Sequence, residues 1–112
     1  MQVTEIFSNN ISQIVLNGRF DSNTSSIVEK FIREQVEAGK KNFVFNLKEV
    51  PFIASAGLRV ILVYAKQLRS GKQGDLRIAC LQPNVLKVFE ISGLNNVLKI
   101  YDDIETALQS FK

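Results

Sequence analysis

The residues of this chain that could do chemistry centre on Ser55, which stands between two alanines and is followed by Gly57. The segment 50–62 predicts the exit from a strand, a short loop and a helix that begins with Ser55 as its cap. Small neighbours leave the hydroxyl accessible, and Gly57 allows another backbone or surface to approach closely. The amides of Ala56, Gly57 and Leu58 would point toward one spot and favour an anion there. The pattern predicts a hydroxyl that can carry a charged group, although a serine at a helix start is also an ordinary cap.

Two further groups of side chains are candidates for contact with a partner. Asp21 and Thr24 follow a predicted strand, and both residue types also suit the cap of the next helix. The helix after Ser55 has one basic side, which is either a solvated face or a surface for acidic residues of a partner. Its three cations are Arg59, one turn from Ser55, Lys66 and Arg69.

The chain lacks the side chains of most catalytic and metal sites. It has no histidine, which excludes Ser-His-Asp catalysis and histidine metal sites. The single Cys80 excludes an internal disulfide, and its apolar surroundings predict a small core residue within a strand. Residues 70–73 (Ser-Gly-Lys-Gln) lack the upstream glycine and the Ser/Thr of a phosphate-binding loop. We therefore expect a protein that is not an enzyme and holds no cofactor or metal.

Composition indicates one water-soluble domain. The chain has 112 residues, 46% of them apolar, and a net charge of +3 that is spread without a basic run, so no nucleic-acid partner is expected. No apolar stretch approaches the ~20 residues of a membrane span, so no integral membrane segment is expected. The polar residues 1–5 do not resemble a signal peptide. Together with the lone cysteine, this predicts a cytoplasmic location.

Apolar periodicity predicts the elements that position these residues. Strands are expected over 3–7, 11–17, 42–47, 76–81 and 97–101. A first helix follows the cap residues 21–24 and ends at Gly39. Further helices are expected from about 56 to 69, from Pro83 to near Gly93, and after 102–103.

The order β-β-α-β-α-β-α-β-α predicts an α/β fold with a mixed, mostly parallel sheet. It would begin with an antiparallel hairpin, because Asn9 and Asn10 tolerate a left-handed turn. Asn46 and Arg77 fall on the side opposite their apolar neighbours, which indicates helices mainly on one face and a partly exposed second face. No linker or repeat divides residues 1–112.

The sequence around Ser55 resembles the signature of STAS domains, the fold of bacterial anti-sigma-factor antagonists. In that family Asp-Ser-Ser-Gly-Leu or Asp-Ser-Ala-Gly-Leu starts the second helix, and residues 54–58 here are Ala-Ser-Ala-Gly-Leu. Similar segments are Gly-Arg-Phe-Asp at 18–21, Asn-Leu-Lys-Glu-Val at 46–50, Phe-Glu-Ile-Ser-Gly-Leu at 89–94 and the ending at 100–108. The resemblance covers essentially the full length and implies a single STAS domain over 1–112.

The resemblance implies a regulatory protein that works by partner switching. The unphosphorylated form would bind an anti-sigma factor that is also a serine kinase, and the sigma factor would be released. Phosphorylation of Ser55 by that kinase would end the binding, and a PP2C-type phosphatase would restore it. The protein is expected to be a monomer or weak dimer. The implied partner-binding residues are Asp21, Thr24, Ala54, Ser55, Ala56, Gly57, Leu58 and Arg59.

Ala54 departs from the family, which has an acidic residue before the phosphoacceptor. The missing carboxylate could position the hydroxyl or the kinase, so two alternatives stay open. One is a STAS accessory subunit of a membrane transporter that works without phosphorylation. The other is a nucleotide- or ligand-binding regulatory module that uses the region near Asp21 and Ser55.

Overall fold

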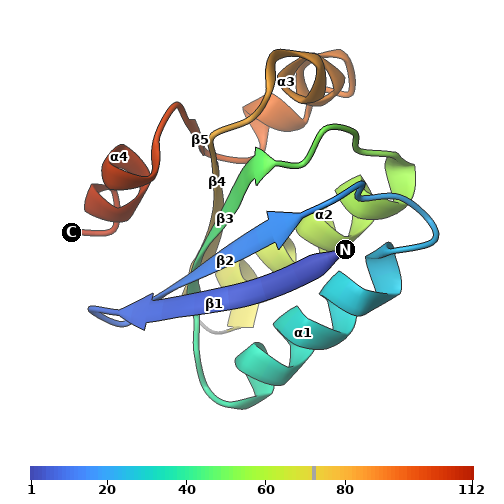
Figure 1. Ribbon diagram of the computed structural model, residues 1–112. Coiled ribbons are helices and arrows are strands. Elements are labelled where there is room, and N and C mark those ends of the chain that lie inside the picture. The colour runs from blue at the N-terminus through green and yellow to red at the C-terminus, as the bar shows by residue number, and fades with distance from the viewer. Residues whose placement is uncertain (72) are drawn as a thin grey trace.

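The computed structural model describes residues 1–71 and 73–112, and in these ranges five strands form one sheet in the order β1-β2-β3-β4-β5 (Figure 1). β1 (Gln2–Ser8) runs antiparallel to β2 (Ile11–Asn17), and the next three strands are parallel: β3 (Asn42–Glu49), β4 (Asp75–Ala79) and β5 (Ile100–Tyr101). The helices are α1 (Ser25–Glu37), α2 (Ser55–Gly71), α3 (Pro83–Ile91) and α4 (Ile104–Gln109), with a 3-10 turn at Leu94–Asn96. The predicted fold class and element order are confirmed.

The hairpin that opens the chain turns through two asparagines. Asn9 has φ of 53° and Asn10 has φ of 63°, which is the left-handed pair of a two-residue hairpin turn. This tight connection fixes the antiparallel register, in which Ser8 lies opposite Ile11.

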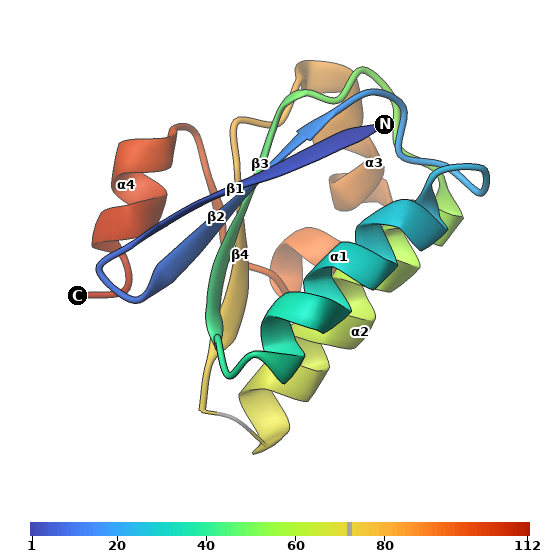
Figure 2. The ribbon, with the colours of Figure 1, turned by 60° about the horizontal axis from the view of Figure 1, so that its bottom comes forward.

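Helices α1, α2 and α3 cover one face of the sheet, and α4 lies against the other (Figure 2). The larger core lies under the first three helices, where α1 contributes Val28, Ile32 and Val36. Full burial of one such side chain contributes about 1.5–3 kcal/mol. The strands supply the opposing layer of this core: Ile14, Leu16, Phe43, Phe45, Leu47, Leu76 and Ile78.

The second face has a smaller core beneath α4. Its buried members are Ile11, Val44, Ala79 and Ala107. Arg77 lies on this face, with its guanidinium 4.0 Å from the Phe111 ring centroid and its Nη1 donating to the Ser110 carbonyl at 2.7 Å. The Asn46 amide, on the same face, donates to Gln13 Oε1 at 3.1 Å. These contacts confirm that polar side chains of β3 and β4 point away from the main core.

Two predicted strand boundaries were wrong. The last strand was expected over 97–101, but the 3-10 turn shortens it to Ile100–Tyr101 because the Leu98 amide bonds to the Leu94 carbonyl. β4 ends at Ala79, so Cys80 follows the strand with φ of 66° instead of lying within it. Lys72, part of the segment 70–73 compared with a phosphate-binding loop, lies outside the described residues.

Candidate functional site

Ser55 is the first residue of α2, and its side chain is exposed. The predicted cap role was wrong: Ala54 precedes the helix, and its carbonyl accepts from the Gly57 amide at 3.0 Å and the Leu58 amide at 3.1 Å. The helix start is fixed from outside α2, because Ile53 forms a bridge with Phe20 and the Ala54 amide donates to the Phe20 carbonyl at 2.9 Å. Ser55 therefore has its hydroxyl free of a capping role.

Gly57 brings the first turn of α2 against the chain's own backbone. A Cβ at this position would lie 2.8 Å from the Phe20 carbonyl oxygen and 2.9 Å from Phe20 Cγ. The expected close approach is confirmed, but the approaching backbone is internal and Gly57 is buried. Gly57 thus holds the first turn of α2 against Phe20, and the expectation that it also contacts a partner stays a prediction.

Two amides, not three, are free at the start of α2. The predicted donors Gly57 and Leu58 are engaged by Ala54, because the first turn closes on that carbonyl. Within the described residues, the Ser55 and Ala56 amides have no acceptor. These two N–H groups and the helix dipole make the position tolerant of negative charge.

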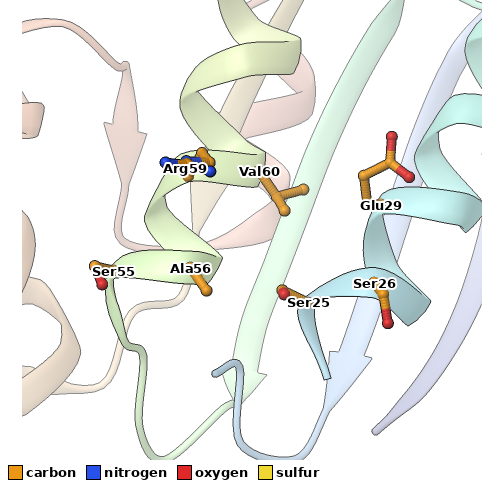
Figure 3. A pocket seen from close by; sticks show the side chains of 7 residues that line it. All are labelled: Ser25, Ser26, Glu29, Ser55, Ala56, Arg59 and Val60. Carbon is orange, nitrogen blue, oxygen red and sulfur yellow. The ribbon is translucent and has the colours of Figure 1, made fainter. Parts of the chain in front are cut away.

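A pocket of about 470 Å³ lies between the starts of α1 and α2. Figure 3 shows Ser55 and Arg59 on the same side of α2, whereas Ala56 and Val60 point toward α1. The α1 residues of the pocket were missed by sequence reasoning. The signal for them was indirect, since two consecutive helices on one face of a sheet must pack side by side. The lining is Ser25, Ser26 and Glu29 from α1, and Ser55, Ala56, Arg59 and Val60 from α2.

Glu29 joins the two helices at the wall of this pocket. Its carboxylate accepts a hydrogen bond from the Tyr64 hydroxyl of α2 and one from Arg33 Nη1, the latter at 2.6 Å. Burial, followed by the interaction with Glu29, raises the pKa of Tyr64 to about 12. Tyr64 is therefore a protonated donor at neutral pH, and the pair fixes α1 against α2.

Asp21 and Thr24 lie in the loop that precedes α1, beside Phe20 and hence near the start of α2. Asp21 Oδ1 accepts from the Asn23 amide at 3.0 Å, and Thr24 Oγ1 donates to the Arg19 carbonyl at 2.7 Å. Desolvation opposes ionisation of Asp21, but hydrogen bonds to its carboxylate from Asn23, Arg19 and Thr24 outweigh that effect and lower its pKa. Thr24 occupies the cap position of α1 without a side-chain cap bond, so the expected capping by Thr24 was wrong. Asp21 instead accepts hydrogen bonds from amides of the turn that leads into α1, from the Asn23 amide through its side chain and from the Ser25 amide through its carbonyl at 2.8 Å.

The remaining predicted side chains fall into different environments. Leu58 is half-buried and packs against the core, whereas Arg59 and Lys66 are exposed and form no ion pair within the described residues. Arg69 bonds to Asp75 at 2.7 Å and to the Val97 carbonyl at 2.7 Å, so its guanidinium is engaged within the chain. Only part of the predicted basic side is therefore open to a partner.

Cys80 is half-buried beside the smaller core. Burial and then the charge of Asp103 raise the pKa of its thiol, which keeps it protonated. In residues 1–71 and 73–112, no group of three or more His, Cys, Asp or Glu residues could hold a metal ion. None of the helices described here has the length and apolar character that crossing a membrane requires.

The sequence model of the STAS domain matches residues 3–107. This chain belongs to the STAS domain family. A Bordetella bronchiseptica protein named as an anti-sigma factor antagonist, BtrV, is 39% identical over 97 residues, which cover 87% of this chain and 83% of that protein. The anti-sigma F factor antagonist of Paenibacillus polymyxa is 32% identical over 94 residues, which cover 83% of this chain and 80% of that protein.

Solved structures share the fold at low sequence identity. A Thermotoga maritima protein described as an anti-sigma factor antagonist superposes with a TM-score of 0.92 at 20% identity, covering 96% of this chain and 92% of that one. Phosphorylated SpoIIAA of Bacillus gives 0.76 at 19%, covering 99% and 100%. A sulfate transporter family protein of Wolinella succinogenes gives 0.77 at 18%, covering 94% and 87%. The STAS fold is thus shared by proteins described as anti-sigma factor antagonists and by a protein described as a sulfate transporter family member.

Proposed function

We propose that this STAS domain is an anti-sigma-factor antagonist that is switched by phosphorylation of Ser55. The names of the two relatives above 30% identity support the first part. One observation supports the second: Ser55 is an exposed hydroxyl at the first position of α2, above the packed Gly57 and beside two free amides. The unmodified protein would bind an anti-sigma factor with serine kinase activity and so release the sigma factor.

The modification is a phosphoryl transfer from a nucleoside triphosphate held by the kinase. Ser55 Oγ attacks the γ-phosphorus, the new O–P bond forms, and the bond to the bridging oxygen breaks to release the nucleoside diphosphate. The hydroxyl proton leaves to a base of the kinase or to water. A PP2C-type phosphatase would reverse the change by adding water to the phosphorus, which releases inorganic phosphate and restores the hydroxyl.

Phosphorylation would act at the interface and leave the fold intact. The start of α2 tolerates negative charge, so a phosphoryl group there does not oppose the helix. Two negative charges about 5 Å from one partner carboxylate repel by ~3 kcal/mol at an effective dielectric of ~40. That repulsion is roughly a hundredfold in affinity.

Phosphorylation in vitro with the cognate kinase, mapped by mass spectrometry, tests the proposal. Ser55→Ala should abolish incorporation of phosphate. Ser25→Ala and Ser26→Ala are matched controls, because both serines line the same pocket, and they should be modified like the parent. Phosphate that maps to Ser25 or Ser26 and persists in Ser55→Ala would refute the assignment.

Ala54 favours a second candidate, an accessory subunit of a membrane transporter that works without phosphorylation. The family acid is absent there, and the fold is shared with a sulfate transporter family protein. Affinity purification separates the two candidates. A co-purified serine kinase supports the switch, whereas a transporter subunit supports the second candidate.

A further inference from the structure

Arg59 is an exposed cation one turn after Ser55, and within residues 1–71 and 73–112 it forms no ion pair. Its side chain lies on the same side of α2 as the Ser55 hydroxyl (Figure 3). The other arginines of the chain each bond to a carboxylate: Arg19, Arg33, Arg69 and Arg77. Arg59 therefore has an uncompensated charge next to the proposed phosphoacceptor.

We propose that Arg59 is the internal counter-ion of phosphorylated Ser55, an inference that rests on the proposed function. Side chains at i and i+4 of a helix have Cβ atoms about 5–6 Å apart, a gap that a phosphoryl group and a long guanidinium side chain can close. The planar guanidinium presents a fork of donors that matches two phosphate oxygens. The order also agrees with the helix dipole, since the anion lies toward the N-terminus and the cation toward the C-terminus.

Other charged groups near the start of α2 are already engaged. Glu29, across the pocket on α1, accepts hydrogen bonds from Tyr64 and Arg33. Arg19 and Asp21, in the loop before α1, bond to each other at 3.4 Å. The cations of these pairs, Arg33 and Arg19, already have a carboxylate partner, whereas Arg59 has none within the described residues.

The pairing would give phosphorylation a second effect on the surface. The phosphoryl group adds negative charge at Ser55 and at the same time withdraws Arg59, which an acidic partner surface would otherwise contact. A partner that binds the unmodified protein through Arg59 would lose that contact and meet a new repulsion.

The test uses protein in which phosphoserine is inserted at position 55 during translation, so no kinase is needed. The pKa of the phosphate is followed by ³¹P NMR through about pH 4 to 8, around its ordinary value near 6. Arg59→Gln should raise this pKa by about 0.3, as expected from a helix pair of this spacing. Arg59→Lys should keep most of the parent value.

Lys66→Gln is the matched control, because Lys66 is exposed, unpaired within the described residues and on the same helix. It lies roughly 16 Å along the helix axis from Ser55, beyond the screening length of about 8 Å at physiological salt. The phosphate pKa should not change in this variant. Equal pKa values in parent and Arg59→Gln, or equal increases in both glutamine variants, would refute the pairing. Failure of a kinase to modify Ser55 would instead refute the proposed function and leave this result unaffected.

Discussion

The two ends of α2 differ in whether their polar side chains have hydrogen-bond or ion-pair partners. At the C-terminal end, Arg69 bonds to Asp75 and to the Val97 carbonyl, and Asp75 also accepts from Arg77 at 2.9 Å. At the N-terminal end, Ser55 and Arg59 have no hydrogen-bond partner for their side chains within the described residues. Arg69 and Asp75 thus find their partners inside the chain, whereas the side chains of Ser55 and Arg59 remain available for other contacts. Substitutions of these polar side chains should therefore differ in whether they affect stability or modification.

Asp75→Asn should have the largest effect on stability. It removes a buried carboxylate that two arginines share, and breaking such a pair leaves positive charge without compensation. We expect a loss of about 2–3 kcal/mol in the free energy of unfolding, measured by urea denaturation. Ser55→Ala, the control at the other end of α2, should stay within about 0.5 kcal/mol of the parent. A loss of that small size in Asp75→Asn would contradict the comparison.

Asp75 also predicts the response to acid. Burial alone would raise its pKa, but hydrogen bonds from Arg77 and Arg69 outweigh that effect and lower it. A carboxyl with a lowered pKa in the folded state contributes stability above its unfolded value of about 3.9, and loses it as the pH falls through the folded value. The parent should therefore lose stability below about pH 4 more steeply than Asp75→Asn does.

Replacing the glycines near the two ends of α2 should give the next largest difference in stability. Gly57→Ala places a Cβ 2.8 Å from the Phe20 carbonyl oxygen, and this backbone atom cannot move without disturbing the helix start. Overpacking of this kind costs about 1–3 kcal/mol. Gly71→Ala meets nothing within 4 Å and should be neutral or stabilising by up to about 1 kcal/mol. Thermal melting of both variants measures the difference, and similar melting temperatures would show that Gly57 has room for a side chain.

The fold was predictable because its determinants are local in sequence. Apolar spacing marked the helix that buries Val28, Ile32 and Val36, and the two asparagines marked the hairpin turn. Asn46 and Arg77 indicated which face the helices leave partly open. Each of these signals depends on neighbouring residues alone.

The details of the site were less predictable because contacts between distant segments set them. Ser55 was expected to cap α2. Instead, the Ala54 amide bonds to the Phe20 carbonyl, and Ala54 is the residue that precedes the helix. The pocket wall formed by Ser25 and Glu29 depends on how α1 packs against α2. Neither feature leaves a pattern near Ser55 in the sequence.

Ala54→Asp should have a smaller effect on stability than Asp75→Asn or Gly57→Ala but a marked effect on phosphorylation. Ala54 stands at the cap position of α2, where an aspartate side chain can accept from a free amide and adds about 1 kcal/mol. A carboxylate next to the hydroxyl can also orient it or take its proton, which is worth up to about 10²-fold in rate when well placed. Partner binding by the unmodified form should change little.

Ala54→Asn separates the cap from the chemistry, because asparagine caps a helix about as well as aspartate but carries no charge and is no base. Both variants should melt at a higher temperature than the parent, by about 4–8 °C for each kcal/mol gained. In a phosphorylation time course with the same kinase, only Ala54→Asp should be faster. If both variants gain rate equally, the acid acts through the order of the helix start and not through the hydroxyl. If neither gains rate, the residue before Ser55 has no part in phosphoryl transfer, and the accessory-subunit function becomes the better explanation of Ala54.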